Sequence, residues 1–469
     1  MTLAGTAAGL AGGLADTALQ GLGKRPRTLR IGLTGLARAG KTALLTSLAA
    51  NLLALGDGQL VLPALIDKLA GRSFRARLAQ SGAESLPRFD ALGHLAAMIE
   101  DPPHWPKRTE AASLLALDLA IGRQGIAANL PPRRIRLEIL DYPGEWLLDL
   151  PLLRQDFATW SRAALARLEA PEAAAIARPF LAFAHALPAG AEADEALARQ
   201  GHLLYRTALH ALRDQCGLSL LQPGRFLIPR DGAEPPWMQF FPLHTGDGRG
   251  GLTRLLARRF DAYTDAARAD LLAPGFGQIE GLMIAADLLT ALATGPAAFA
   301  DASTALAEAV NALHWRRDWG STLSALARFR LPPPPIRRVA FVATKADHVA
   351  ERQRGNLARL MGTLTATPQA AGLPVLATAI AAVRCTEDFI WTLDGKPVSA
   401  VRGRIPSAEG GQIARSWPGE VPDKPPGPDF FAHPFLRLPD FEPVRPSKGG
   451  GVPQLGLGAL AAFLLEDVL

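Results

Sequence analysis

Residues suited to bind a nucleoside triphosphate stand near the beginning of the chain, where positions 35–42 are GLARAGKT. This string matches the phosphate-binding loop G-x-x-x-x-G-K-[ST], although a glycine-rich turn with a chance Lys-Thr is the alternative. In such a loop, backbone N–H groups and the beginning of a helix face one anion. Lys41 is then expected to reach the β- and γ-phosphates, and the Thr42 hydroxyl to bind Mg²⁺. The expected nucleotide contacts here are Gly35, Arg38, Ala39, Gly40, Lys41, Thr42 and Ala43.

An aspartate and a glycine in the string DYPG at positions 141–144 could complete the phosphate end of the site. An aspartate at the carboxyl end of a core strand can hold Mg²⁺ through water, and Gly144 can offer its N–H to the γ-phosphate. A switch threonine is also expected, and Thr109 is the candidate, with an ordinary loop or N-cap threonine as the alternative. The predicted metal-binding residues are therefore Thr42, Thr109 and Asp141.

The string TKAD at positions 344–347 indicates which base is bound. The carboxylate of Asp347 can accept hydrogen bonds from N1–H and the exocyclic amine of guanine, while the Lys345 stem packs on the ring. Adenine has no donor at N1, so Asp347 disfavours ATP. Thr344 opens this motif, and Thr378-Ala379 is predicted to offer a backbone N–H to guanine O6.

Strands must hold these motifs in place, and the sequence supplies an apolar or alternating run before each of them. The leucines that follow Thr42 are spaced for one face of a helix, so the first loop stands between a strand and a helix. We therefore predict an α/β fold with a Ras-like P-loop GTPase core and a mostly parallel sheet, interrupted by a mostly helical insertion. The predicted strands are 29–34, 135–139, 282–287, 339–343 and 374–377.

Length and composition set further bounds. At 469 residues the chain is too long for one compact core, and 48% hydrophobic with 20% charged residues fits a soluble globular protein. Two cysteines form no disulfide framework and indicate a reducing compartment. The net charge of +6 is modest, and we find no dense basic run with interleaved aromatics, which argues against nucleic-acid binding. No apolar run is long enough for a transmembrane helix, so a cytoplasmic location is expected.

Five segments are predicted along the chain, and the inserted one is expected to be helical. Its helical periodicity covers 161–176, 192–214 and 252–271, and the aromatic patch at 235–241 is expected to be core. A β-hairpin is predicted at 387–403, turning at Asp394-Gly395. The segments are an N-terminal helix or arm (1–24), the first part of the GTPase core (25–150), the helical insertion (151–275), the second part of the core (276–403), and a Pro/Gly-rich tail with a short terminal helix (404–469).

With these motifs placed, nearly the whole chain resembles the YcjX family of bacterial stress-associated P-loop GTPases. The similar strings are GLARAGKT (35–42), WPKRT (105–109), DYPGEWLLDLP (141–151), ALATGP (291–296) and TKAD (344–347), together with the proline-rich tail. The resemblance implies a Ras-like GTPase core that binds GTP or GDP with Mg²⁺, in a cytosolic bacterial protein connected with envelope or heat stress. It does not supply a partner.

Two positions bear on catalysis. Glu145 stands where Ras-like GTPases carry a water-orienting glutamine, and it could orient water or be a weaker substitute whose charge repels the γ-phosphate. Arg38 lies inside the phosphate loop, as does the arginine finger of the similar loops in guanylate-binding proteins and atlastins. The alternatives for Arg38 are a solvated loop residue and a salt-bridge partner. The candidate catalytic residues are Arg38, Glu145 and Thr109.

The sequence thus predicts an enzyme, a GTP-binding and GTP-hydrolysing switch protein whose partner is a guanine nucleotide. A nucleotide-gated binding module with negligible turnover is one alternative, and an ATP-using remodeller is another. A nucleotide-dependent homodimer and weak peripheral contact with the inner membrane are further hypotheses; the N-terminal arm could be the contacting helix, or could pack on the nearest domain or be left frayed.

Overall fold

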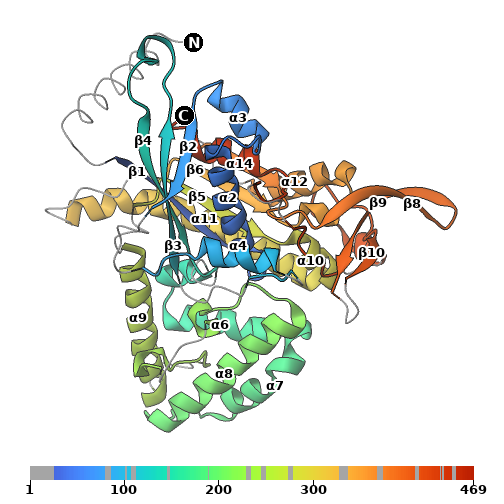
Figure 1. The fold of residues 1–469 in the computed structure, drawn as a ribbon. Helices are drawn as coiled ribbons and strands as arrows, with labels where there is room; N and C mark the ends of the chain where they lie inside the picture. Colours follow the sequence, from blue (N-terminus) through green and yellow to red (C-terminus); the bar gives the residue numbers. More distant parts are fainter. Residues whose placement is uncertain are drawn as a thin grey trace.

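A seven-stranded sheet with the strand order β2-β3-β4-β1-β5-β6-β7 forms the centre of the molecule (Figure 1). Strands β4, β1, β5, β6 and β7 are parallel, whereas β3 pairs antiparallel with β4 and β2 with β3. This mostly parallel sheet confirms the predicted α/β fold. The strands are β1 (Arg27–Gly35), β2 (Phe74–Leu78), β3 (Ser113–Ile121), β4 (Arg133–Asp141), β5 (Gly281–Ala286), β6 (Arg338–Ala343) and β7 (Val375–Ala379).

The fold is seen in a computed structural model of the chain. The described residues are 26–79, 86–100, 103–106, 112–144, 148–188, 190–228, 234–244, 250–272, 278–326, 336–366, 373–406, 411–433, 435, 438–445 and 450–469. Side chains are described in these ranges except at 270–272 and 312–326. The predicted N-terminal arm and the candidates Thr109 and Glu145 lie outside the described residues.

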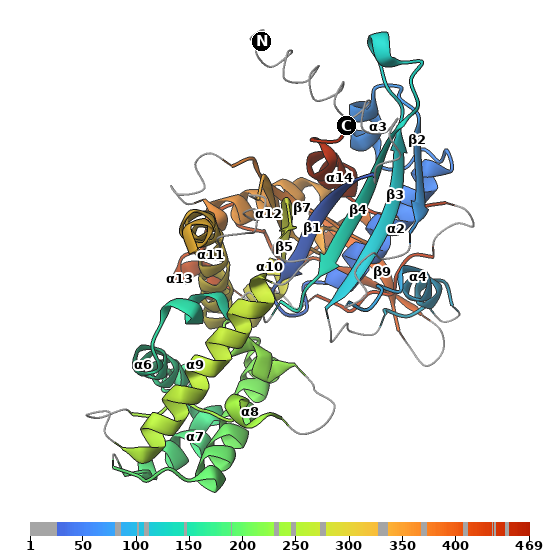
Figure 2. The same ribbon diagram turned by 90° about the vertical axis from the view of Figure 1, so that its left-hand side faces the viewer.

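Helices cover both faces of the sheet (Figure 2). One apolar core lies between the sheet and helices α2, α3 and α14, and a second lies between the opposite face and α10, α11 and α12. Strands β5 and β6 are buried along their whole length, as expected for parallel strands covered on both sides. The helices are α2 (Lys41–Gly56), α3 (Pro63–Leu69), α4 (Ala91–Ile99), α10 (Leu288–Thr294), α11 (Pro296–Leu326), α12 (Glu351–Thr365) and α14 (Leu457–Leu465).

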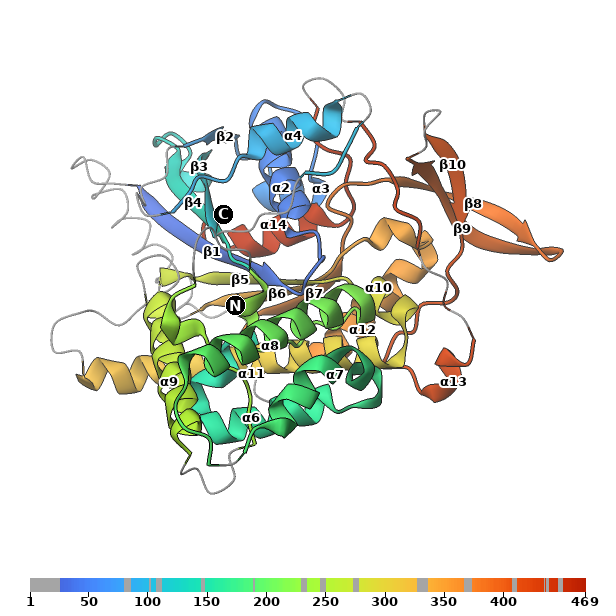
Figure 3. The same ribbon diagram turned by 90° about the horizontal axis from the view of Figure 1, so that it is seen from below.

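Between β4 and β5 the chain forms a group of helices with an apolar core of its own (Figure 3). The rings of Trp160, Phe240 and Phe260 lie within 5.8 Å of one another there, so the aromatic patch is core, as predicted. The helix predicted at 161–176 is two helices, because Pro171 cannot continue a helix but suits the first position of a new one. The helices are α6 (Phe157–Leu168), α7 (Pro171–Ala186), α8 (Glu195–Cys216) and α9 (Gly251–Leu272).

A small three-stranded sheet follows the core and extends away from it (Figure 3). It contains β8 (Thr386–Leu393), β9 (Lys396–Ile405) and β10 (Gln412–Ser416). The turn between β8 and β9 has positive φ at Asp394 (49°) and Gly395 (75°), the signature of a two-residue hairpin, so the predicted hairpin is confirmed.

The last segment returns to the central sheet. After the short helix α13 (Pro428–Phe431), helix α14 packs on α3 and on β6, with Leu457, Leu460 and Leu464 buried. The terminal helix predicted near 455–469 is therefore part of the core. Within the part of the chain that the structure describes, no helix is both long and apolar enough to cross a membrane.

Candidate nucleotide-binding site

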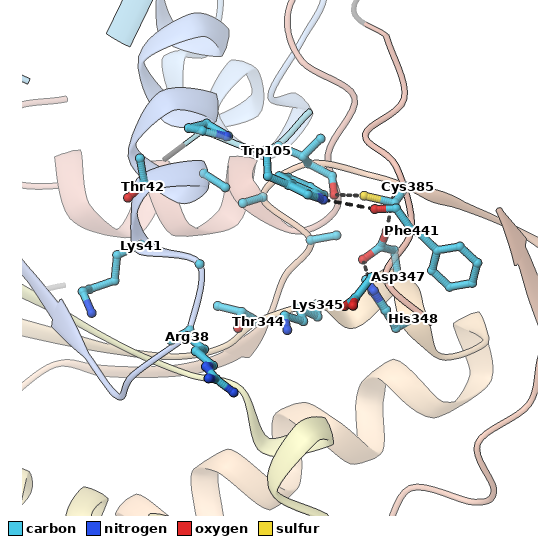
Figure 4. A pocket seen from close by; sticks show the side chains of 18 of the residues that line it. Arg38, Lys41, Thr42, Trp105, Thr344, Lys345, Asp347, His348, Cys385 and Phe441 are labelled. Atoms are coloured by element: carbon cyan, nitrogen blue, oxygen red, sulfur yellow. Dashed lines mark hydrogen bonds and ion pairs between the residues drawn. The ribbon is translucent and has the colours of Figure 1, made fainter. Parts of the chain in front are cut away.

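A cavity of about 380 Å³ lies where the central parallel strands end, and it is large enough for a small-molecule ligand (Figure 4). Ligands of open α/β sheets bind at this edge, because the loops that leave parallel strands meet there. The lining comes from the phosphate loop, the segment around Trp105, the end of β4, the TKAD string, the loop after β7 and the tail. Segments more than 300 positions apart in the sequence therefore share one site.

The phosphate loop takes its shape from two glycines. Gly35 has a φ of 152°, and a Cβ there would lie 2.1 Å from the carbonyl oxygen of Ala285. Gly40 has a φ of 73° and directly precedes α2. No side chain among the described residues caps α2, and its first turn contains no acidic residue. The N–H groups at the start of this 16-residue helix thus face the cavity with the polarity that an anion requires.

Lys41 and Gly144 both lie against the backbone carbonyl of Gly35 in this loop. The Nζ atom of Lys41 lies 3.2 Å from the carbonyl oxygen of Gly35. Gly144 approaches the same carbonyl so closely that a Cβ on Gly144 would lie 1.7 Å from it and 3.0 Å from Lys41 Nζ. Gly144 lines a small adjoining cavity with Leu36 and Ala37, and the structure therefore joins the DYPG string directly to the phosphate loop.

Thr42 and Asp141 both line the main cavity. Thr42 is in the first turn of α2, while Asp141 is buried at the end of β4, where it pairs in register with Leu33 of β1. A hydroxyl and a carboxylate are hard oxygen donors, which suit Mg²⁺. The residues present thus fit a magnesium–nucleotide complex. The third predicted metal-binding residue, Thr109, is outside the described part of the chain.

Asp347 lies at the other end of the cavity, in the short helix η6 (Ala346–His348) that follows β6. Its buried carboxylate accepts a hydrogen bond from the Cys385 N–H at 2.6 Å, and its Oδ1 lies 3.2 Å from Nδ1 of His348. Burial and, to a lesser extent, the charge of Asp347 raise the pKa of the Cys385 thiol. These contacts hold the carboxylate in one orientation beside a neutral thiol.

Lys345 and Thr344 connect this end of the cavity to β5. The backbone N–H of Thr344 donates to the carbonyl of Ala286 at 3.0 Å. Lys345 has a φ of 60°, and its Nζ pairs with Asp287 at 2.6 Å. Because Asp287 also caps α10 through the Thr290 N–H, the ammonium group of Lys345 is fixed against the central sheet.

The loop after β7 lines the cavity with residues other than the predicted Thr378 and Ala379. Thr378 and Ala379 are still within β7, opposite Val342 and Ala343 of β6. They are not among the cavity-lining residues, which at this loop are Ala381, Ala382, Val383 and Cys385.

Several residues that line the cavity belong to none of the predicted site motifs. Trp105 and Pro106 precede Thr109, and Asp440 and Phe441 belong to the tail. The Trp105 string is part of the family resemblance, but neither His348 nor the tail residues belong to a recognisable motif. Tail residues reach the cavity through tertiary packing, for which the sequence has no local signal.

Arg38 points away from Lys41 and Thr42 (Figure 4). Its backbone is left-handed, with a φ of 62°, and its guanidinium donates to Asp214 of α8 at 3.3 Å. A hydrogen bond from Arg213 and, more weakly, the charge of Arg38 lower the pKa of Asp214. Because the side chains are 60% and 48% exposed, this ion pair adds little stability and can open readily.

The sheet order, the glycine loop and the cavity define a protein with a Ras-like P-loop core. The chain belongs to the YcjX-like family, DUF463, whose family model matches residues 29–469, and this confirms the resemblance inferred from the motifs. It is 32% identical over 459 residues to a protein of Escherichia coli strain K12 named "Ras-like GTPase YcjX", covering 94% of this chain and 96% of the relative. A protein of the same name from Shewanella oneidensis MR-1 is 30% identical over 440 residues, covering 89% of each.

Proposed function

We propose that this protein binds and hydrolyses GTP and acts as a nucleotide-dependent switch. The observation that carries the proposal is the single cavity that Lys41, Thr42, Asp141 and Asp347 all line. Each has the chemistry that one part of a magnesium–GTP complex requires, and they come from three different elements, α2, β4 and η6. The names of the two relatives support the same activity.

Each residue has a separate task in this proposal. Lys41 and the amides of the phosphate loop would bind the phosphates, and Thr42 and Asp141 would hold Mg²⁺, which supplies charge neutralisation when bound. Asp347 would accept hydrogen bonds from the base, and Lys345 would pack along it. Phosphoryl transfer needs mainly positioning and neutralisation of charge, which such a set of groups provides.

The switch element is expected at Gly144. This glycine lies against the Gly35 carbonyl and Lys41 Nζ, where the γ-phosphate is sensed in the proposed complex. The helical insertion begins only a few residues later, and its helix α8 reaches back to the phosphate loop through Asp214. A change at Gly144 would therefore be passed directly to the insertion.

Release of inorganic phosphate from GTP and ATP by the purified protein, with Mg²⁺, tests the proposed function. We expect multiple turnovers of GTP and far slower turnover of ATP. Lys41→Ala serves as the control. It removes the positive charge that would contact the phosphates, so nucleotide binding should be lost while the circular dichroism spectrum is unchanged. Equal turnover by Lys41→Ala, or equal use of ATP and GTP, would contradict the proposal.

A nucleotide-gated binding module with negligible turnover is the second candidate. It is favoured by one observation, the orientation of Arg38 toward Asp214 and away from the phosphate end of the cavity. Tight binding of GTP without release of phosphate at any protein concentration would support this candidate over the first.

A further inference from the structure

The C-terminal tail supports the end of the cavity that Asp347 lines, which is the base end in the proposed function. The loop that follows β7 is hydrogen-bonded to the tail along its backbone: Ala381 and Leu455 exchange two bonds, of 3.0 and 2.9 Å. Arg384 donates to Pro453 at 2.7 Å and accepts from Val444 at 3.4 Å. The tail therefore supports the loop from which Ala381, Val383 and Cys385 line the cavity.

Phe441 anchors the tail at this point. The residue is only 2% exposed and packs in one apolar cluster with Val383 and Cys385. Its ring lies 5.3 Å from the ring of His348, next to Asp347. With the ring fixed in this way, the backbone carbonyl of Phe441 has a defined position at the cavity.

Trp105, from a distant segment of the chain, reaches this carbonyl. Its indole Nε1–H donates to the Phe441 oxygen at 3.1 Å, joining residues 336 positions apart (Figure 4). Trp105 lines the cavity and is 40% exposed, so it lies at the edge between the cavity and solvent. It is four positions before Thr109, the candidate switch residue.

We propose that Trp105 and the tail form a clasp across the edge of the cavity that slows the release of bound guanine nucleotide. The proposal rests on the proposed function, because the retained ligand is the guanine nucleotide. The indole hydrogen bond closes the clasp, and Phe441 is its fixed end. Removing the Phe441 ring would disturb the buried apolar cluster to which it belongs. Trp105, in contrast, is exposed enough to be changed without unfolding the protein.

The test measures how fast a bound nucleotide leaves. Wild-type protein and variants are loaded with a fluorescent N-methylanthraniloyl GDP and mixed with excess GDP, and the decay of fluorescence is followed. Trp105→Phe keeps a ring but removes the donor, and Trp105→Ala removes both. Trp391→Phe, in β8 and not among the residues lining the cavity, is the matched control.

Loss of one net hydrogen bond should speed release by roughly 2- to 12-fold in Trp105→Phe, with a larger increase in Trp105→Ala and none in Trp391→Phe. Melting temperatures equal to that of the wild type would show that the variants are folded. If the wild type retains the nucleotide but Trp105→Phe releases it at the same rate, the clasp is wrong and the proposed function stands. If the wild type does not bind the nucleotide at all, both proposals fall.

Discussion

Arg38 is the residue whose position bears most directly on turnover. Hydrolysis builds negative charge on the transferring phosphoryl group, and an arginine supplied in cis can speed it by roughly 10³–10⁵-fold. Here the guanidinium pairs instead with Asp214 at 3.3 Å, although both side chains are largely exposed. Since an exposed pair is worth about 1 kcal/mol or less, nucleotide binding could move Arg38 at little cost.

We expect Arg38→Ala to keep GTP affinity within a few-fold while lowering kcat, the pattern of an interaction made mainly in the transition state. Asp214→Ala is the matched control, because it releases Arg38 without removing it and so should not lower kcat. If association of two copies brings Arg38 to the phosphates, wild-type turnover per molecule should also rise with protein concentration. A wild-type rate for Arg38→Ala at all concentrations would make Arg38 an ordinary surface residue.

At the scale of single residues, the local strings identify the phosphate loop and Asp141, which both line the cavity. The phosphate loop begins at the last residue of β1, Asp141 is the last residue of β4, and Gly144 follows three positions later, so their places in the structure come from that local arrangement. The base end was harder to predict. The Thr378-Ala379 dipeptide matches a known pattern, but β7 continues through it because it pairs with β6, and the lining begins at Ala381.

Among the elements, the segment that connects the DYPG string to the insertion contains one buried carboxylate. Asp149 accepts hydrogen bonds from the Gly224 N–H at 2.6 Å and the Tyr263 hydroxyl at 2.5 Å, and Arg225 lies 3.7 Å away. Burial raises the pKa of Asp149 to about 6 from its ordinary value of 3.8, outweighing Arg225 and these hydrogen bonds. This connecting segment therefore contains a carboxyl group whose pKa is about 6.

This shift predicts how stability depends on pH. Because the folded-state pKa is above the unfolded value, the contribution of Asp149 is complete below pH 3.8 and is lost as the pH rises through about 6. Asp149→Asn removes this dependence. The free energy of unfolding of the wild type, relative to Asp149→Asn, should thus fall by about 1.4 kcal/mol between roughly pH 5 and 7.5.

Urea unfolding at the two pH values measures this difference. The control is Asp156→Asn at the start of α6, where hydrogen bonds to Thr159 lower the pKa of the carboxyl group. That group is ionised in both states throughout the range, so the difference between wild type and Asp156→Asn should not change. If the free energies of unfolding of the wild type and Asp149→Asn change equally between the two pH values, Asp149 does not titrate in this range.

The same elements show which parts of the fold the sequence could predict. Periodicity located α8 and α9 closely, because each buries one continuous stripe in the core of the insertion. It merged α6 and α7, because the apolar spacing runs across Ala170-Pro171, where the proline ends the first helix. Pairing of β2 with β3 and of the tail with the loop after β7 depends on distant segments and has no local pattern.

For the molecule as a whole, the insertion and the tail contact different segments of the cavity lining. The insertion follows Gly144 and contacts the phosphate loop through Asp214, while the tail supports the loop beside Asp347. The phosphate end would thus report the state of the nucleotide to the insertion, and the base end would retain it. Both depend on the central claim that the ligand is a guanine nucleotide.

Calorimetric titration of the wild type and Asp347→Asn with GDP, ADP and XDP in the presence of Mg²⁺ tests that claim most directly. In the proposed complex, Asp347 would accept hydrogen bonds from N1–H and the exocyclic amine of guanine, and adenine lacks the N1–H donor, so the wild type should bind GDP far more tightly than ADP. An amide at position 347 matches the altered edge of xanthine, so Asp347→Asn should lose affinity for GDP and gain it for XDP. Equal affinity of the wild type for GDP and ADP, or an unchanged preference in Asp347→Asn, would contradict the account.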